Sequence, residues 1–206
     1  MQVVYDEGFN NLVKACILSE VKGYNPVKEP NLNSKEFVSV KDYTMNQLFI
    51  EWDWVNGTPH DVSALENAIT LALRHRCISQ ELVFNVISQA LKWGVDYVLT
   101  RQSLEAKRFC NKVFSVREEL RDAKLNMKFM QNGDTLFGRY FFSHNISDLL
   151  LQFYQKRFPD KRVVIVNHAD SYSVVHANPC PVLTPSQGDL HPAGISASAV
   201  TLNSFF

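Results

Sequence analysis

The hydrophobic periodicity of the chain changes near residue 125. Upstream of it, apolar residues recur at spacings of three and four, which is typical of helices. Downstream of it, two aromatic, β-prone runs at residues 127–129 and 136–142 flank Asn132-Gly133. An Asn-Gly pair between two such runs is the strongest short-range signal for a β-hairpin. The sequence therefore predicts an α+β fold, in which a helical segment is followed by strands.

The first third of the chain is predicted to open as strand, turn and helix. Residues 3–5 are β-prone, and apolar side chains recur at helical spacing from Phe9 onwards. Residues 23–33 contain Pro26 and Pro30 among polar side chains, which favours a connecting loop. Residues 36–54 fit a strand and a helix equally well.

Capping signals mark the central helices. Ser63, followed three residues later by Glu66, predicts a helix that begins there and runs to about residue 76. Ser79 predicts the start of a second helix, and Gly94 is expected to interrupt or end it. Residues 103–124 form a third helical pattern that is rich in Lys and Arg. Together these segments predict a central helical layer.

The carboxy-terminal third returns to mixed structure. Residues 146–158 have helical spacing, residues 163–166 form an apolar strand, and residues 172–175 are its expected hairpin partner. We expect the amino-terminal strand and the carboxy-terminal hairpins to form a small, mostly antiparallel sheet in a single α+β domain over residues 1–178. Residues 179–206, rich in Pro, Ser, Gly and Ala, are expected to form an extended tail that adds little stability.

Composition and segment lengths limit the class of protein. The chain has 206 residues, of which 46% are hydrophobic, and this is ample for a packed core. Its apolar stretches are far shorter than the roughly 20 residues that a membrane helix needs, and no basic segment followed by an apolar run opens the chain. We therefore expect a soluble, cytoplasmic protein without membrane contact. The four cysteines form no C-x-x-C pair and are expected to be reduced thiols.

Charge is distributed unevenly although the formal net charge is zero. Residues 1–71 carry five Lys/Arg against ten Asp/Glu, whereas residues 72–128 carry eleven against six. The basic helical segment suggests phosphate contacts to a nucleic acid, and an equally good alternative is a positive helical layer facing the acidic first third. The candidate nucleic-acid-binding residues are Lys107, Arg108, Lys112, Arg117 and Arg121.

Catalytic and cofactor motifs give little support to an enzyme. The six histidines include no H-x-x-x-H pair, and the chain has neither G-x-S-x-G nor the glycine-rich loops that hold nucleotide phosphates. We therefore predict no metal site and no cofactor, and we assign no catalytic residue. Ser143 or Asn145 is expected to cap the helix that begins at Ile146.

Scattered positions, in the run Tyr5–Val13 and between Leu136 and Val166, resemble a bacterial family described as probable DNA-metabolism proteins. The run from Tyr5 to Val13 looks like that family's "Y-D-G-S-F-x-G-L-L" opening. The carboxy-terminal match is better and consists of Leu136-Phe137-Gly138-Arg139-Tyr140, His144-Asn145-Ile146, Phe153, Arg157-Phe158-Pro159-Asp160 and residues 163–166. Between these ends, Ala106, Val113, Glu118, Arg121 and Phe129 fall near a family helix that reads "E-x-H-R-x-x-x-F-x-R-F".

The resemblance implies a role beside DNA repair or modification. Members of the family resemble partners of a radical S-adenosylmethionine protein and occur fused to uracil-DNA-glycosylase-like domains. The resemblance also implies a possible family site at Glu118, His144, Asn145 and Arg157. The chain departs from the pattern at Leu120, Ser143 and Asn167, where the family has a histidine and two acids. Any chemistry of those side chains is absent from this sequence.

Two functional hypotheses follow, from different classes. The first is a non-catalytic, nucleic-acid-associated adaptor that works with an enzyme partner. The alternative is a protein-interaction subunit or inhibitor that binds another protein without nucleic-acid contact. A third hypothesis, an enzyme, requires Glu118, Arg121, His144 and Arg157 to meet in one pocket.

Overall fold

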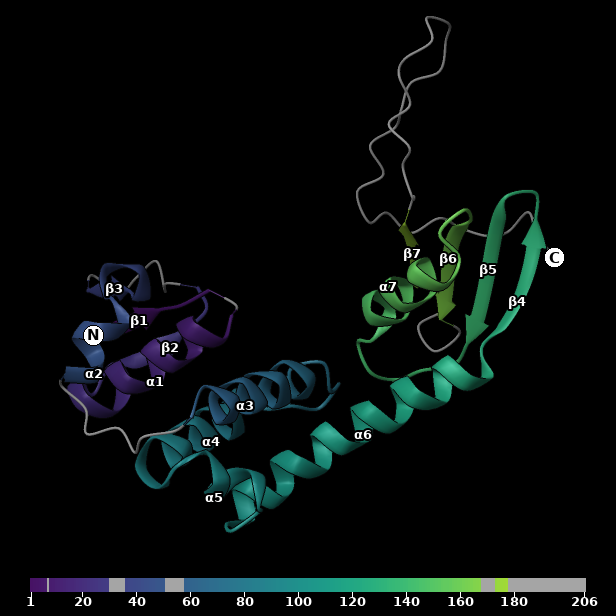
Figure 1. The fold of residues 1–206 in the computed structure, drawn as a ribbon. Coiled ribbons are helices and arrows are strands. Elements are labelled where there is room, and N and C mark those ends of the chain that lie inside the picture. The colour runs from purple at the N-terminus through teal and green to yellow at the C-terminus, as the bar shows by residue number, and fades with distance from the viewer. Residues whose placement is uncertain (7, 30–35, 51–57, 168–172, 178–206) are drawn as a thin grey trace, which may run out of the picture. The chain divides into compact units, whose positions relative to one another are not determined.

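The computed structural model describes residues 1–6, 8–29, 36–50, 58–167 and 173–177, with the backbone alone at residues 49–50 and 173–177. The chain forms two compact units, Met1–Ser115 and Val116–Phe206. Figure 1 shows the elements of both units as a ribbon drawing. Helix α6 (Leu104–Asn126) contributes residues to both units. Among the described residues, no helix combines the length and apolar character needed to cross a membrane.

Unit 1 begins with a small parallel sheet. Strand β1 (Gln2–Val4) lies between β2 (Asn25–Val27) and β3 (Phe37–Ser39), and both of its neighbours run parallel to it. Helix α1 (Phe9–Lys22) connects β1 to β2 and ends at Gly23, whose φ of 67° is left-handed. Strand β2 occupies an edge of the sheet, where a proline that cannot donate a hydrogen bond is tolerated. Pro26, predicted to lie in a loop, is therefore part of a strand.

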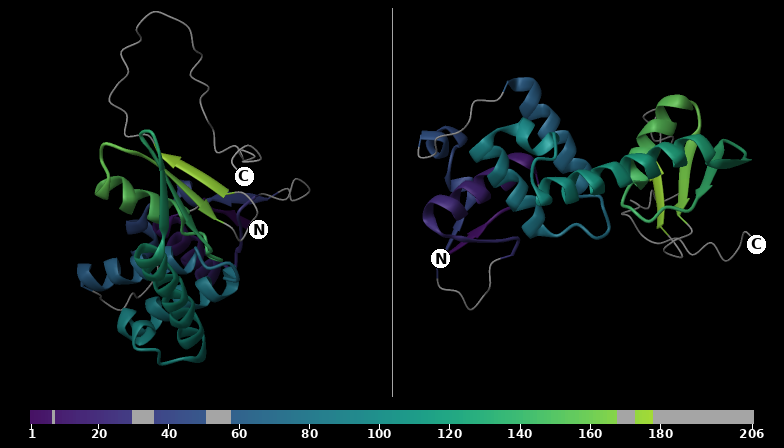
Figure 2. Two further views of the ribbon diagram at one scale, coloured as in Figure 1. Left: turned by 90° about the vertical axis from the view of Figure 1, so that its right-hand side faces the viewer. Right: turned by 90° about the horizontal axis from the view of Figure 1, so that it is seen from below.

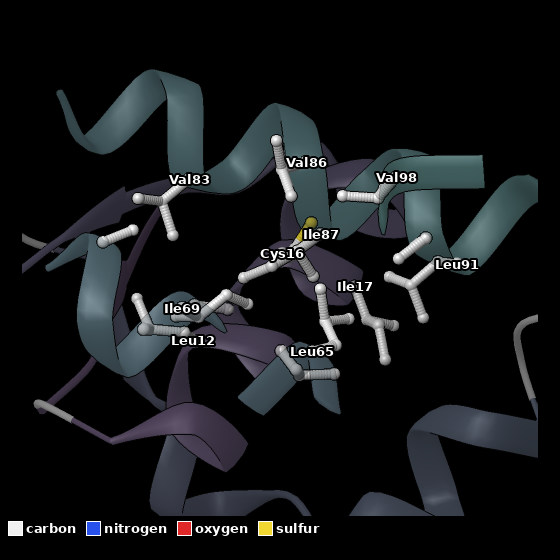
Figure 3. Close-up of a cluster of buried hydrophobic side chains, with 14 of the residues drawn as sticks. Leu12, Cys16, Ile17, Leu65, Ile69, Val83, Val86, Ile87, Leu91 and Val98 are labelled. Carbon is white, nitrogen blue, oxygen red and sulfur yellow. The ribbon is translucent and has the colours of Figure 1, made fainter. Parts of the chain in front are cut away.

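Helices fill the rest of unit 1. They are the 3₁₀ helix η1 (Val40–Asp42), α2 (Met45–Ile50), α3 (Pro59–Ala72), α4 (Gln80–Trp93), α5 (Val95–Leu99) and the first half of α6. Figure 3 shows part of the core of unit 1, where side chains of α1, α3, α4 and α5 meet and Leu12, Ile69 and Val86 are nearly inaccessible to solvent. Cys16 lies in the same core, and its burial raises the pKa of the thiol to about 12.

The start of α3 corrects the predicted capping box. Thr58 is the N-cap: its side chain accepts a hydrogen bond from the Asp61 backbone N–H at 3.2 Å, and its own N–H donates to Asp61 at 2.9 Å. Pro59, in the first helical position, has no N–H to leave unsatisfied. Ser63 thus lies inside the helix, one turn after its start. The predicted cap at Ser79 and the end at Gly94 are confirmed for α4.

Unit 2 contains a mixed sheet of four strands in the order β4-β5-β6-β7. The strands are β4 (Lys128–Asn132), β5 (Thr135–Tyr140), β6 (Arg162–Asn167) and β7 (Ser173–Ala177). The predicted hairpin joins β4 to β5, and Gly133 in its turn has a φ of 56°. Helix α7 (Ser147–Arg157) connects β5 to the parallel strand β6, and it covers one face of the sheet (Figure 2). The predicted β6–β7 hairpin pairing is also confirmed.

The α+β class agrees with the sequence prediction, whereas two features of the arrangement differ from it. The amino-terminal strand belongs to a parallel sheet of its own and does not pair with the carboxy-terminal strands. The single domain expected over residues 1–178 is divided into two compact units. The predicted tail, residues 179–206, lies outside the described residues.

Candidate functional site

The five predicted cations of α6 point in different directions. Arg108 and Lys112 are four residues apart on one helical face and belong to unit 1. Arg117 and Arg121 form a second pair with the same spacing, in unit 2. Lys107 is turned by about 100° from Arg108, because that is the rotation per residue in a helix. The structure therefore does not gather the five side chains on one helical face, and their joint role in binding stays a prediction.

Two of these cations have partners within the chain. The Lys112 ammonium donates a hydrogen bond to the Cys77 carbonyl oxygen at 2.7 Å. The Arg121 guanidinium pairs with Glu118 at 2.5 Å and with Asp122 at 3.5 Å, on the exposed side of α6. Arg121 would have to give up these carboxylates before it could bind a phosphate.

The carboxylate that organises the loop before α7 is Glu119, next to the predicted Glu118. Its Oε1 accepts hydrogen bonds from the Ser143 N–H at 2.7 Å and the Ser143 hydroxyl at 2.8 Å, and its Oε2 accepts from the His144 N–H at 2.8 Å. Ser143 thus donates its hydrogen bonds to Glu119. The N-cap of α7 is Ile146, whose side chain makes no capping hydrogen bond. The predicted capping role is therefore not the role of Ser143, and for Asn145 it stays a prediction.

The remaining residues of the predicted family site are distributed over the surface of unit 2. His144 is half-buried in the loop that Glu119 holds, and Asn145 is exposed beside it. Arg157 is exposed in the last turn of α7. It lies near Tyr154, where burial raises the pKa of the phenol and the positive charge of Arg157 opposes that rise. Glu118 itself is committed to Arg121.

One face of the unit 2 sheet is packed against α7. The Phe129 ring of β4 lies 4.7 Å from the Tyr154 ring and 5.8 Å from the Phe158 ring, measured between centroids. Phe129 is paired in register with Gly138, and Gly138 with Ile165. A Cβ atom on Gly138 would come within 2.5 Å of the Met127 sulfur, so a larger residue here would displace the Met127 or Phe129 side chain. These residues therefore mark the helix-facing side of the sheet.

The opposite side of the sheet, termed the outer face here, follows from strand alternation, because neighbouring residues of a strand point to opposite faces. Its rows are fixed by the strand register. Described residues of the outer face are Lys128, Met130 and Asn132 of β4, Thr135, Phe137 and Arg139 of β5, and Arg162, Val164 and Val166 of β6. Met130 is 51% exposed, and Lys128 and Arg162 are exposed as well.

Phe141 extends this face beyond the end of β5. The next residue, Phe142, is 1% exposed, and its backbone N–H donates to the Asn167 side-chain oxygen at 3.2 Å. The Asn167 amide donates in return to the Phe142 carbonyl at 2.9 Å. Because Phe142 points into the interior, its neighbour Phe141 points outward, and it is 67% exposed. Phe137, Arg139 and Phe141 thus alternate aromatic and cationic residues along the sequence, with Phe141 just past the end of β5.

The outer face has a consistent charge. Lys128, Arg139 and Arg162 are cations, and the outer-face positions of β4, β5 and β6 given above include no Asp or Glu. Asp134, in the hairpin turn, is paired with Lys161 at 3.3 Å. The described part of the face therefore combines positive charge with exposed Met130 at one edge, whereas Phe137 and Arg139 are half-buried and Val164 and Val166 are buried.

The outer face was not predicted from the sequence, in which the candidate cations lie on α6. The residues of this face nevertheless alternate along the two runs that flank Asn132-Gly133. They are Lys128 and Met130 before the turn, and Phe137, Arg139 and Phe141 after it. A two-residue period in these runs assigns all five side chains to a single face once the hairpin register is set.

Metal ligands do not gather in the described ranges, since His, Cys, Asp and Glu side chains there form no group of three or more that could hold an ion. No family model, curated protein or solved structure matches the chain. The resemblance to DNA-metabolism proteins therefore stays a prediction based on the sequence.

Proposed function

We propose that the protein is an accessory, non-catalytic nucleic-acid-binding protein whose outer sheet face holds a single-stranded segment. The observation that carries this proposal is the outer face itself, where Lys128, Arg139 and Arg162 accompany the aromatic side chains Phe137 and Phe141. Single-strand-binding proteins combine the same two elements, positive charge along the backbone and aromatic rings on which bases stack.

The two kinds of side chain have different roles in this proposal. Lys and Arg neutralise phosphates and release counterions, so they supply affinity that is independent of sequence and falls as salt rises. Phe141 offers a flat ring to an unstacked base, and such stacking contributes about 1–3 kcal/mol per base. A duplex keeps its bases stacked inside the helix and cannot use the ring in this way. The proposal therefore favours single strands over duplexes.

Fluorescence anisotropy with labelled single-stranded and duplex oligonucleotides, at low and at moderate salt, tests this function. Phe141→Ala should weaken single-strand binding about 5- to 150-fold, the equivalent of the stacking energy. Lys128→Ala should weaken it at low salt and reduce the slope of log affinity against log salt by about 0.7.

Two exposed residues of α6 give matched controls. Phe114→Ala removes an aromatic side chain that is 57% exposed, and Lys107→Ala removes an exposed cation, and neither residue lies on the outer face. Because this proposal places the strand on the outer face and not on α6, both controls should bind as the wild type does, and a loss in Lys107→Ala would instead support the role predicted for the α6 cations. No binding at low salt, or an equal loss in Phe114→Ala and Phe141→Ala, would overturn the proposal.

The biological setting belongs to the same proposal and rests on the family resemblance. That resemblance adds a cytoplasmic role in DNA repair or modification, beside a radical-SAM-type enzyme. Purification from the native host after nuclease digestion tests the protein partner separately from the nucleic acid. Recovery of a stoichiometric radical-SAM protein would support this setting, and its absence under crosslinking would contradict it.

A second candidate function, a protein-interaction subunit, is favoured by an aromatic pair on unit 1. Trp93 is 55% exposed at the end of α4, and its ring lies 4.9 Å from the Tyr97 ring of α5. Exposed tryptophans often carry much of the energy of a protein interface. Trp93→Ala should then abolish the recovery of a nuclease-resistant protein partner while leaving oligonucleotide binding unchanged.

A further inference from the structure

A groove of about 590 Å³ lies in unit 1, between the start of α4 and the first half of α6. Helix α6 contributes Arg108 and Lys112, which are four residues apart on one face. The amides of Asn85 and Asn111 line the same groove from α4 and α6. Its remaining lining residues are His75, Ser79, Glu81, Leu82 and Glu105. The volume lies within the usual range for small-molecule sites, about 300–1,000 Å³.

One wall of the groove is held by hydrogen bonds within unit 1. Lys112 donates to the Cys77 carbonyl at 2.7 Å, and the Cys77 N–H donates to His75 Nδ1 at 3.0 Å. Ser79 caps α4 by accepting a hydrogen bond from the Leu82 N–H at 3.3 Å. The loop between α3 and α4 is therefore linked to α6 by a hydrogen bond at the edge of the groove.

Several polar groups in the groove have unused hydrogen-bonding capacity. The Lys112 ammonium has three N–H donors, of which one is used on Cys77. Within the described residues, Arg108, Asn85 and Asn111 form neither hydrogen bonds nor ion pairs through their side chains. Glu105 accepts one long bond, at 3.4 Å from Gln89. The groove thus offers two cations, two amides and two carboxylates to a ligand.

We infer that this groove binds a nucleoside monophosphate, with the phosphate held by Arg108 and Lys112. An Arg fork and an ammonium together match a phosphate dianion. Carboxamides such as those of Asn85 and Asn111 match the donor and acceptor pairs on base edges. The carboxylates of Glu81 and Glu105 would repel a bare anion, but they accept hydrogen bonds from the ribose hydroxyls of a nucleotide.

The mixed charge of the groove decides between ligand classes. A simple anion would be attracted by the two cations of the groove and repelled by its two carboxylates, so the net electrostatic attraction would be small. A nucleotide carries its negative charge on the phosphate and its hydroxyl and amino donors on the ribose and base, so it can use both the cations and the carboxylates that line the groove. This site differs from the outer face in its residues, its unit and its ligand.

Isothermal titration of the full chain with the four ribonucleoside 5′-monophosphates, with the matching nucleosides and with inorganic phosphate tests the inference. At least one monophosphate should bind saturably, and its nucleoside should bind ten or more times more weakly, the equivalent of about 1.4 kcal/mol. Arg108→Ala should remove the difference between nucleotide and nucleoside. Asn111→Ala should weaken both.

Lys107→Ala is the matched control, because Lys107 is the preceding cation on α6 and does not line the groove. It should bind the nucleotide as the wild type does. Circular dichroism of each variant separates lost binding from lost folding, and Arg108→Lys, which retains the charge, should recover part of the affinity. Absence of saturable binding, equal affinity for phosphate and nucleotide, or an equal loss in Lys107→Ala would each overturn the inference.

Discussion

The Glu119 carboxylate holds Ser143 through both its backbone N–H and its hydroxyl, at 2.7 and 2.8 Å. The second oxygen of the same carboxylate accepts the His144 N–H, so a side chain of α6 fixes the backbone that leads into α7. Hydrogen bonds to a charged acceptor contribute about 1.5–3 kcal/mol each when they are shielded, and less when they are open to water.

Glu119→Ala should lower the free energy of unfolding by about 1.5–3 kcal/mol, because it leaves these loop donors without their acceptor. Glu118→Ala is the matched control: it removes a surface ion pair with Arg121, which is 60% exposed, and should cost less than about 1 kcal/mol. Urea denaturation of both variants measures the difference. Equal losses would show that Glu119 does not hold the loop in solution.

Acid should weaken the contact between α1 and α4 through Glu20. Its pKa is lowered, first by the hydrogen bond that the Ser88 hydroxyl donates at 2.6 Å, and also by Lys92 at 2.9 Å. A carboxyl group whose folded-state pKa is lowered stabilises the fold above the unfolded value, here 4.5, and loses that contribution as the pH falls towards the folded-state pKa.

Glu20→Gln should therefore show a smaller loss of stability than the wild type when the pH is lowered below 4.5. Ser88→Ala, which removes the main cause of the lowered pKa, should act in the same direction. Thermal melts across the acidic range provide the measurement. An unchanged acid dependence in Glu20→Gln would show that other groups cause the acid sensitivity.

Gly138→Ala should destabilise unit 2 by about 1–3 kcal/mol, because the added methyl group overpacks the sheet. The new Cβ would lie 2.5 Å from the Met127 sulfur and 2.8 Å from the Phe129 ring. Met127→Ala in the same chain should recover part of this loss, because it removes the nearer of the two contacts. A double-mutant cycle measured by denaturation tests the coupling, and strictly additive losses would contradict it.

Cysteine labelling should distinguish two of the thiols in the native protein. Cys16 is buried and its pKa is raised to about 12, so almost none of it is thiolate at neutral pH. Cys77 is exposed. Iodoacetamide near pH 8 should therefore modify Cys77 in the native state and reach Cys16 only after denaturation, as peptide mass spectrometry can determine. Early modification of Cys16 would show that the core of unit 1 opens readily.

Local signals predicted the elements of this fold better than their pairing. Asn132-Gly133 located the hairpin, and Ser79 and Gly94 located the two ends of α4, because turn and cap preferences act over a few residues. The parallel pairing of β5 with β6 depends on a crossover through α7 that no short pattern encodes. Pro26 was misassigned because only the edge position of its strand makes a proline acceptable there.

The candidate sites show the same limit. Lys112 and Arg108 were found from charge alone, but the groove they line requires α4 beside them. Glu118 and Glu119 are indistinguishable in a helical pattern, and only the position of Ser143 shows which one holds the loop. Two residues of the same type, such as Glu118 and Glu119, can therefore have different roles, because their partners are distant in sequence.

The side-chain amide of Asn167 makes the two hydrogen bonds that a backbone peptide group of a neighbouring strand would make. Its side chain presents one donor and one acceptor to Phe142, as a neighbouring strand would, so the ladder is extended by one step after the backbone pairing of β5 has ended. An aspartate in its place would accept from the N–H and repel the carbonyl, since it has no donor when ionised. The backbone that follows the exposed Phe141 is thus held by the chemistry of a single amide on another strand.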